Sequence, residues 1–326
     1  MHYSAGSQVL DSSDIWLCPH APVLPDVRRL NMKGYNRPIV ATCHYDGNYL
    51  SISKNANNRW VEMLMFINKS MEPNYKKVLP QSIVRTEVIR PIMHRDKIVI
   101  PDEFQGEYIT LVNANKNKGV DQFIEIAKRM PERKFLGVLP YYGELQVPLA
   151  PPNVTWVPFD DDIRNILRKT RILLMPSYYE SFGRIAVEAM INGIPVVYSK
   201  PIVPSQYPGG STEGVQEWIG DIGIACSRDV PEEWMNAIQS LDFPESYSER
   251  SMRSKQHIDE LNLFTEAPRI AGVVEDFSRQ YPATKIVQQV QQQQSQSQTQ
   301  SVAPRLKEPL GPVGFGFSNG RLRIQR

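Results

Sequence analysis

The chain has 326 residues and a net charge of +2, and its 41% of hydrophobic residues is ordinary globular composition, sufficient for two domains of average size. It contains no apolar run of about 18 residues, so we expect no membrane-spanning helix, and its first ten residues lack the features of a secretory signal. Its three cysteines are widely separated and not in metal-ligand spacing, which indicates reduced thiols and a cytoplasmic protein.

The first hundred residues carry strand-like segments with irregular spacing. These candidate strands lie at residues 14–18, 38–43, 63–67 and 84–89. A charged stretch near 93–104, flanked by Pro91 and Pro101, follows them and is typical of a linker. We therefore predict a short α/β domain over residues 1–100.

Strand and helix signals alternate in the next part of the chain. The expected strands, apolar throughout, lie at 108–113, 134–139, 154–157, 172–175, 195–198 and 222–225. The expected helices lie at 119–130, 161–169, 183–192 and about 268–281. Such alternation indicates a parallel sheet covered on both faces, and we predict a Rossmann-like α/β domain over residues 101–281.

Residues 282–326 differ from the rest in composition. They hold six Lys or Arg and one Glu, so the preceding part of the chain is net negative. Gln and Ser dominate residues 287–301, which leaves too little apolar surface to offset the entropy of ordering. We predict a Gln-rich, basic, disordered tail with two interpretations, a contact with a polyanion or a solubilising tether.

The segment from Ser177 to Val197 consists of a strand end, a loop, a helix that stops at Gly193, and a new strand. Ligands of open α/β sheets bind at the carboxyl ends of strands, where this loop is expected. The helix start offers free N–H groups to a diphosphate, and Gly183 permits close approach of a ligand. Glu180 in the loop and Glu188 on the helix can accept hydrogen bonds from two hydroxyl-bearing groups, such as a sugar and a ribose.

The pattern around Glu180 and Glu188 resembles the E-x7-E signature of retaining glycosyltransferases of the GT-B fold, family 4. The matching residues are Pro176-Ser177, Phe182-Gly183, Glu188-Ala189 and Gly193-Ile-Pro-Val-Val197. The resemblance covers about residues 110–238. It implies two Rossmann-like domains that face a cleft, and a nucleotide diphosphate sugar as co-substrate with no further cofactor. It also implies sugar transfer with retention of anomeric configuration. Glu180 would contact the transferred sugar and Glu188 the nucleotide ribose, with Ser181 and Arg184 in the same donor site.

A second segment, Leu111 to Asp121, places Lys118 beside Gly119 after a strand and a polar loop. A lysine there can neutralise a phosphate as a point charge, although a solvated surface lysine is the alternative interpretation. The segment resembles the family's strand–loop–Lys-Gly element, except that Asn113 stands where the family has an arginine. Arg184 is the candidate for supplying the missing charge.

His44 follows the candidate strand 38–43 and resembles the family's histidine near the acceptor, with an incidental loop histidine as the alternative. Glu180, Lys118 and His44 are thus the catalytic candidates. Residues Asp160 to Asp162 contain an Asp-x-Asp pattern, which binds a metal in another glycosyltransferase fold. Because it precedes a helix here, we interpret it as an N-cap and expect no metal site.

The function predicted from the sequence is transfer of a sugar from a nucleotide diphosphate sugar. The first domain is short for the family, and the acceptor stays open between a protein, a glycan and a modified nucleic acid. The alternative is a glycosyltransferase-like protein that binds a nucleotide or glycan without catalysis. Nucleotide release distinguishes the two, because only an enzyme turns its donor over.

Overall fold

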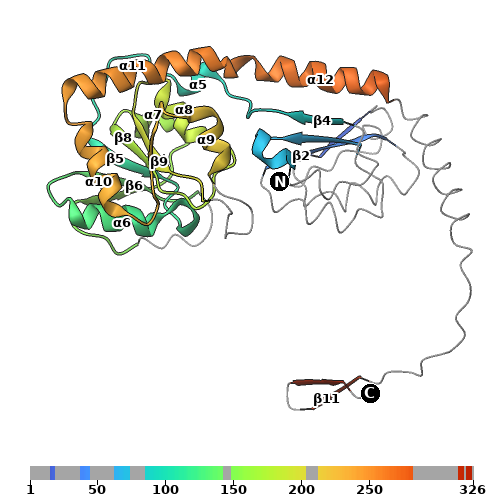
Figure 1. The fold of residues 1–326 in the computed structure, drawn as a ribbon, viewed down its shortest axis with the longest axis horizontal. Helices are drawn as coiled ribbons and strands as arrows, with labels where there is room; N and C mark the ends of the chain where they lie inside the picture. Colours follow the sequence, from blue (N-terminus) through green and yellow to red (C-terminus); the bar gives the residue numbers. More distant parts are fainter. Residues whose placement is uncertain are drawn as a thin grey trace, which may run out of the picture. The chain divides into compact units, whose positions relative to one another are not determined.

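The computed structural model describes residues 15–18, 37–44, 62–73, 85–141, 148–202 and 212–281, and the backbone of two strands at 315–318 and 321–324. The chain divides into two units, Met1–Ala283 and Thr284–Arg326. The first unit contains two parallel sheets with helices around them (Figure 1). The expected α/β fold class is thereby confirmed.

The smaller sheet has four strands in the order β1-β2-β3-β4, and every neighbouring pair is parallel. The strands are β1 (Trp16–Cys18), β2 (Ile39–Cys43), β3 (Met63–Phe66) and β4 (Arg85–Val88). All residues of β2 and β3 are buried, which explains why their sequences are apolar without alternation. Each of the four segments expected in the first hundred residues contains one of these strands.

The larger sheet has six parallel strands in the order β10-β9-β8-β5-β6-β7. The strands are β5 (Tyr108–Val112), β6 (Phe135–Val138), β7 (Val154–Val157), β8 (Thr170–Met175), β9 (Val196–Ser199) and β10 (Ile224–Cys226). All six match the expected segments to within two residues at each end.

The two faces of the larger sheet are buried by different helices. On one face, Ile172 and Leu174 of β8 share a core with α6 (Val120–Arg129) and α10 (Pro231–Ser240). On the other face, Leu173 and Met175 share a core with α8 (Arg184–Met190), α9 (Glu213–Ile219) and α11 (Pro244–Leu261). This second core continues into the smaller sheet through residues of β2 and β3, so apolar packing joins the two sheets.

The chain passes between the two sheets twice. Residues 89–107, which include α5 (Arg95–Ile98), lead from β4 to β5, and α12 (Glu266–Gln280) returns after η5 (Leu263–Thr265). Figure 1 shows α12 running alongside β4. Arg85 of β4 donates a hydrogen bond to Asp276 of α12 over 2.7 Å. The two crossings also contact each other, because the Arg90 amide donates to Glu266 over 2.8 Å.

The second unit contains an antiparallel pair, β11 (Phe315–Ser318) and β12 (Arg321–Ile324). Sequence analysis did not predict these strands, although Asn319-Gly320 between them is a dipeptide typical of hairpin turns. The Gln-rich segment 287–301 lies outside the described residues.

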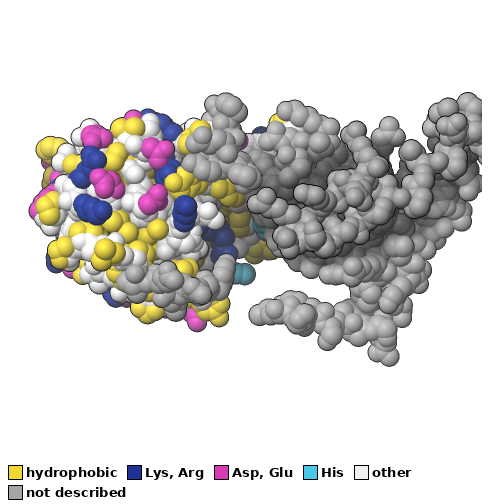
Figure 2. Space-filling view, turned by 90° about the horizontal axis from the view of Figure 1, so that it is seen from below, with side chains coloured by type: hydrophobic (Ala, Val, Ile, Leu, Met, Phe, Trp, Pro, Cys, Tyr) yellow, Lys and Arg dark blue, Asp and Glu magenta, His cyan; other side chains and the backbone are white. Residues whose placement is uncertain are grey.

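No helix among the described residues is long and apolar enough to span a membrane. Figure 2 shows basic and acidic side chains interspersed over the described surface of the larger sheet's domain, without a continuous region of one charge on that face.

Candidate functional site

The candidate site lies where the strand order of the larger sheet changes direction. The chain goes from β5 outward to β6 and β7, and then returns to β8 on the other side of β5. The loops after β5 and β8 therefore separate and leave a crevice at the carboxyl ends of the two strands, the usual ligand position in this type of sheet. Both predicted donor-site segments follow these strands, Lys118 after β5 and Glu180 after β8.

A cavity of about 920 Å³ occupies this crevice. Residues from both sheets line it, including Thr42 and Ile67 of the smaller sheet's domain and Met175 at the end of β8. All nine predicted site residues line the cavity. They are His44, Asn113, Lys118, Glu180, Ser181, Phe182, Gly183, Arg184 and Glu188. The volume is within the range of small-molecule sites and suits a ligand as large as a nucleotide.

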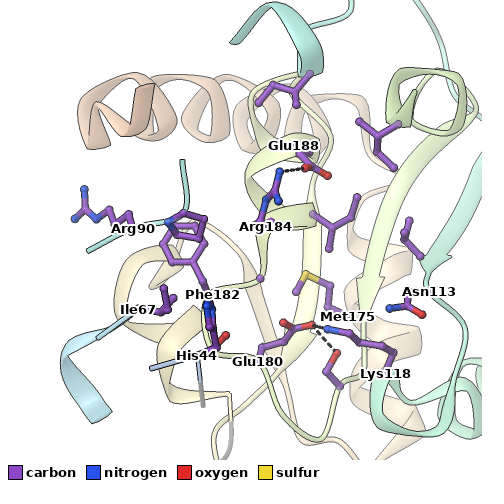
Figure 3. Close-up of a pocket in the computed structure, with 18 of the residues that line it drawn as sticks. His44, Ile67, Arg90, Asn113, Lys118, Met175, Glu180, Phe182, Arg184 and Glu188 are labelled. Atoms are coloured by element: carbon purple, nitrogen blue, oxygen red, sulfur yellow. Dashed lines mark hydrogen bonds and ion pairs between the residues drawn. The ribbon is translucent and has the colours of Figure 1, made fainter. Parts of the chain in front are cut away.

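Lys118 and Glu180 both line the cavity and form an ion pair (Figure 3). The Lys118 ammonium donates to Glu180 Oε1, and the Ser177 hydroxyl donates to the same oxygen over 3.2 Å. The Glu180 side chain is 8% exposed, whereas that of Lys118 is 28% exposed. The carboxylate is thus held on one oxygen, and its other oxygen has capacity for a further hydrogen bond.

Glu188 lies on the first turns of α8, away from the Lys118–Glu180 pair (Figure 3). Burial raises the pKa of Glu188 above its ordinary value, and the charge of Arg184 opposes that increase. The Arg184 guanidinium is 3.7 Å from Glu188 Oε1 and its side chain is 59% exposed. The predicted phosphate cation Arg184 therefore accompanies Glu188, and Lys118 accompanies Glu180.

The loop between Glu180 and α8 is fixed by contacts outside the cavity. Asn68 donates to the Ser181 carbonyl over 2.6 Å, and the Trp218 indole donates to the Phe182 carbonyl over 2.6 Å. The Phe182 and Trp218 rings also stack, with centroids 5.4 Å apart. Gly183 is the N-cap of α8. Its φ of 73° is a left-handed conformation, which favours glycine.

Asn113 and His44 line opposite parts of the cavity. Asn113 follows β5 directly and has a φ of 65°, a left-handed conformation that asparagine adopts more readily than most residues. Its side-chain oxygen accepts a hydrogen bond from Asn115 over 2.9 Å. His44 is exposed beside the site loop, where its carbonyl accepts a hydrogen bond from the Tyr179 hydroxyl over 2.9 Å.

Other polar residues of the site were missed by sequence analysis. Ser177 was part of the recognised segment but received no role, and Arg90 and Lys97 from the first crossing also line the cavity. Their position after β4, at a strand's carboxyl end, was the available signal.

The acidic segment at Asp160 acts as predicted. Asp162 is the N-cap of α7 (Ile163–Leu167), and its side chain accepts the Arg164 amide over 3.1 Å. Within the described part of the chain, no cluster of three His, Cys, Asp or Glu side chains is suited to hold a metal ion.

Residues 107–241 match the model of the family described as glycosyl transferases group 1. The chain is thus similar to this family over 135 of its 326 residues. The matched region includes the six strands of the larger sheet and both segments that form the Lys118–Glu180 pair.

Curated relatives that match part of the chain are named D-inositol 3-phosphate glycosyltransferase. The protein of that name from Corynebacterium kroppenstedtii is 29% identical over 123 residues, which are 37% of this chain and 25% of that protein. The chain thus spans about a quarter of the length of this curated relative.

Solved structures show the same fold over more of the chain. HepE of Anabaena, solved in complex with UDP and glucose, has a TM-score of 0.62 and 16% identity, over 89% of this chain and 80% of that one. Sucrose-phosphate synthase from Thermosynechococcus elongatus has a TM-score of 0.65 and 15% identity, over 82% of this chain and 74% of that one. The likeness extends beyond residues 107–241 to the smaller sheet and establishes the GT-B fold.

Proposed function

We propose that this protein transfers a sugar from a nucleotide diphosphate sugar to a hydroxyl acceptor, with retention of anomeric configuration. The observation that carries the proposal is the Lys118–Glu180 pair, which lines the cavity in the region similar to glycosyl transferases group 1. The bond broken in such a reaction joins a sugar, rich in hydroxyls, to a negatively charged phosphate. The carboxylate can accept hydrogen bonds from the sugar hydroxyls, and the neighbouring ammonium can neutralise the charge of the phosphate.

In the proposed mechanism each group has a separate task. Glu180 accepts hydrogen bonds from hydroxyls of the transferred sugar and so fixes its position. Lys118 stabilises the negative charge that develops on the leaving diphosphate. Glu188 binds the nucleotide ribose, with Arg184 beside it as a second cation. No metal and no further cofactor takes part in this scheme.

The acceptor enters from the side of the smaller sheet in this proposal. The lining residues there are mixed in character, with Ile67 and Ile89 apolar and Arg90 basic. His44 is the candidate to contact the acceptor hydroxyl, since it is exposed at the carboxyl end of β2.

A screen of nucleotide sugars by thermal shift, followed by a nucleotide-release assay on each hit, tests the proposal. UDP-glucose is the first probe because HepE was solved with UDP and glucose. Slow hydrolysis is expected even without the acceptor, and the glucose first released should be the α anomer by NMR if configuration is retained. Stabilisation without any nucleotide release would instead support a protein that binds without catalysis.

Two variants connect turnover to the site. Lys118→Ala and Glu180→Ala should each greatly reduce nucleotide release while the protein stays folded. Full donor turnover by both variants would show that these side chains do not carry the reaction.

A further inference from the structure

Asn68 lies outside the recognised segments, at the carboxyl end of β3. It is 4% exposed, and it is the N-cap of η3 (Lys69–Met71). Its side-chain oxygen accepts the Met71 amide over 3.1 Å and the Ser70 hydroxyl over 2.6 Å. One end of the amide group is therefore used within its own turn, and the NH₂ group remains for a partner elsewhere.

That partner belongs to the loop between Glu180 and α8, here called the donor-site loop, 113 positions later in the chain. Asn68 Nδ2 donates to the carbonyl of Ser181, the residue directly after Glu180, over 2.6 Å. Gly214 of α9 closes over this hydrogen bond. A Cβ at Gly214 would lie 1.8 Å from Ser181 O and 2.4 Å from Asn68 Nδ2, so only glycine fits there. The backbone of α9 thus packs directly against this hydrogen bond, which is partly buried.

The same turn is also held against α9 by a contact that does not involve the loop. The Glu217 carboxylate accepts the amides of Lys69 and Ser70 over 2.8 and 3.3 Å. The turn thus has two separable functions. Glu217 docks it against the larger sheet's domain, and Asn68 extends from it to the backbone that carries Glu180.

We propose that Asn68 is a positioning residue of the donor site, which fixes the backbone after Glu180 and thereby sets the place of its carboxylate. This inference rests on the proposed function, because Glu180 is the group that holds the sugar there. Since the peptide unit is planar, restraint of the Ser181 carbonyl restrains the whole link between Ser181 and Phe182. The smaller sheet thereby takes part in the geometry of a site formed by the larger one.

The test compares three single variants of the full chain. Asn68→Asp keeps an oxygen to cap η3, because Asp is also a good N-cap, but it replaces the donor facing Ser181 by an oxygen. Ser70→Ala removes a partner of Asn68 within the turn and leaves the bond to Ser181. Glu217→Gln weakens the docking contact alone. Nucleotide release from UDP-glucose gives kcat and KM, and hydrogen exchange of a peptide covering residues 177–183 reports the loop without requiring turnover.

We expect Asn68→Asp to lower kcat at least tenfold with KM changed less than threefold, and to speed exchange of the loop at least tenfold. Ser70→Ala and Glu217→Gln should stay within threefold of the wild type in both measurements. Equal losses in Glu217→Gln would mean that docking of the sheets is responsible, and wild-type behaviour of Asn68→Asp would refute the positioning role.

The experiment also distinguishes a variant that fails to fold from a failure of the proposed function. If Asn68→Asp does not fold, Asn68→Ser takes its place, since serine also caps a helix but is too short to reach Ser181. If the wild type releases no nucleotide from any donor, the proposed function fails, while exchange of the loop still decides whether Asn68 fixes it.

Discussion

Replacement of Lys118 by methionine separates the structural from the catalytic contribution of the ion pair. Methionine keeps most of the apolar length of lysine and removes the ammonium. The Glu180 carboxylate, 8% exposed, then retains only the Ser177 hydroxyl at 3.2 Å among its partners in the described structure. The companion variant Glu180→Gln removes the charge on the other side, and the double variant removes both.

The structure sets the expected size of each effect. Removal of one partner of a fully buried ion pair costs about 3–5 kcal/mol. Because the Lys118 side chain is 28% exposed, water can reach the vacated position, and we expect a smaller loss of about 1–3 kcal/mol. The double variant leaves no unpaired charge, so its loss should fall short of the sum of the single losses by about 1–2 kcal/mol.

Unlike stability, activity should not improve when the two substitutions are combined. Because Lys118 is proposed to stabilise the leaving diphosphate, its replacement in Lys118→Met should lower kcat by roughly a hundredfold, equivalent to about 2.7 kcal/mol. The double variant should regain stability relative to the sum but regain no activity. Urea unfolding and nucleotide release measure the two quantities on the same samples. Recovery of activity together with stability in the double variant would refute a catalytic role for Lys118.

Three further predictions concern the framework of the site. Burial raises the pKa of Glu62 to about 8 from 4.5, so the folded state holds its proton more tightly, and stability should fall as the pH rises from about 5 to 8. Glu62→Gln should flatten that dependence in urea unfolding at several pH values; an unchanged slope would contradict it. Gly214→Ala should lower stability by about 3 kcal/mol or more because its Cβ would meet the Ser181 backbone, whereas Gly272→Ala in α12, with nothing within 4 Å, should be neutral or stabilising. Asn192→Ala should cost about 2–3 kcal/mol, since the Asn192 side chain accepts the Ile100 amide over 2.8 Å and is buried; a change in melting temperature no larger than that of Gly272→Ala would argue against it.

The strands and the two site segments could be predicted from local sequence, but the contacts between them could not. The strands β5 to β10 were predictable because buried parallel strands are apolar throughout. The helix α11 was not, since Ser254 and Ile258 are its only buried residues among eighteen and leave almost no apolar periodicity. The end of β3 was predicted, but nothing local to Asn68 indicates a bond to Ser181.

The candidate site divides in the same way. The placement of Lys118 and Glu180 after two strands was predictable, because the carboxyl ends of parallel strands meet at one edge of a sheet. Their direct ion pair and the association of Arg184 with Glu188 depend on loop conformations that no local pattern specifies. The roles of these side chains toward a donor stay predictions until turnover is measured.

The return of α12 to the smaller sheet makes sequence order a poor guide to what a truncation would damage. Phe277 of α12 is fully buried in the core that includes Met63 and Met65 of β3. A chain cut after residue 265 would keep every strand of the larger sheet. It would nevertheless expose the core beside the smaller sheet, whose strands lie about two hundred positions earlier in the sequence. We therefore expect such a truncated chain to lose the smaller sheet first, and with it the Asn68 contact to the donor-site loop.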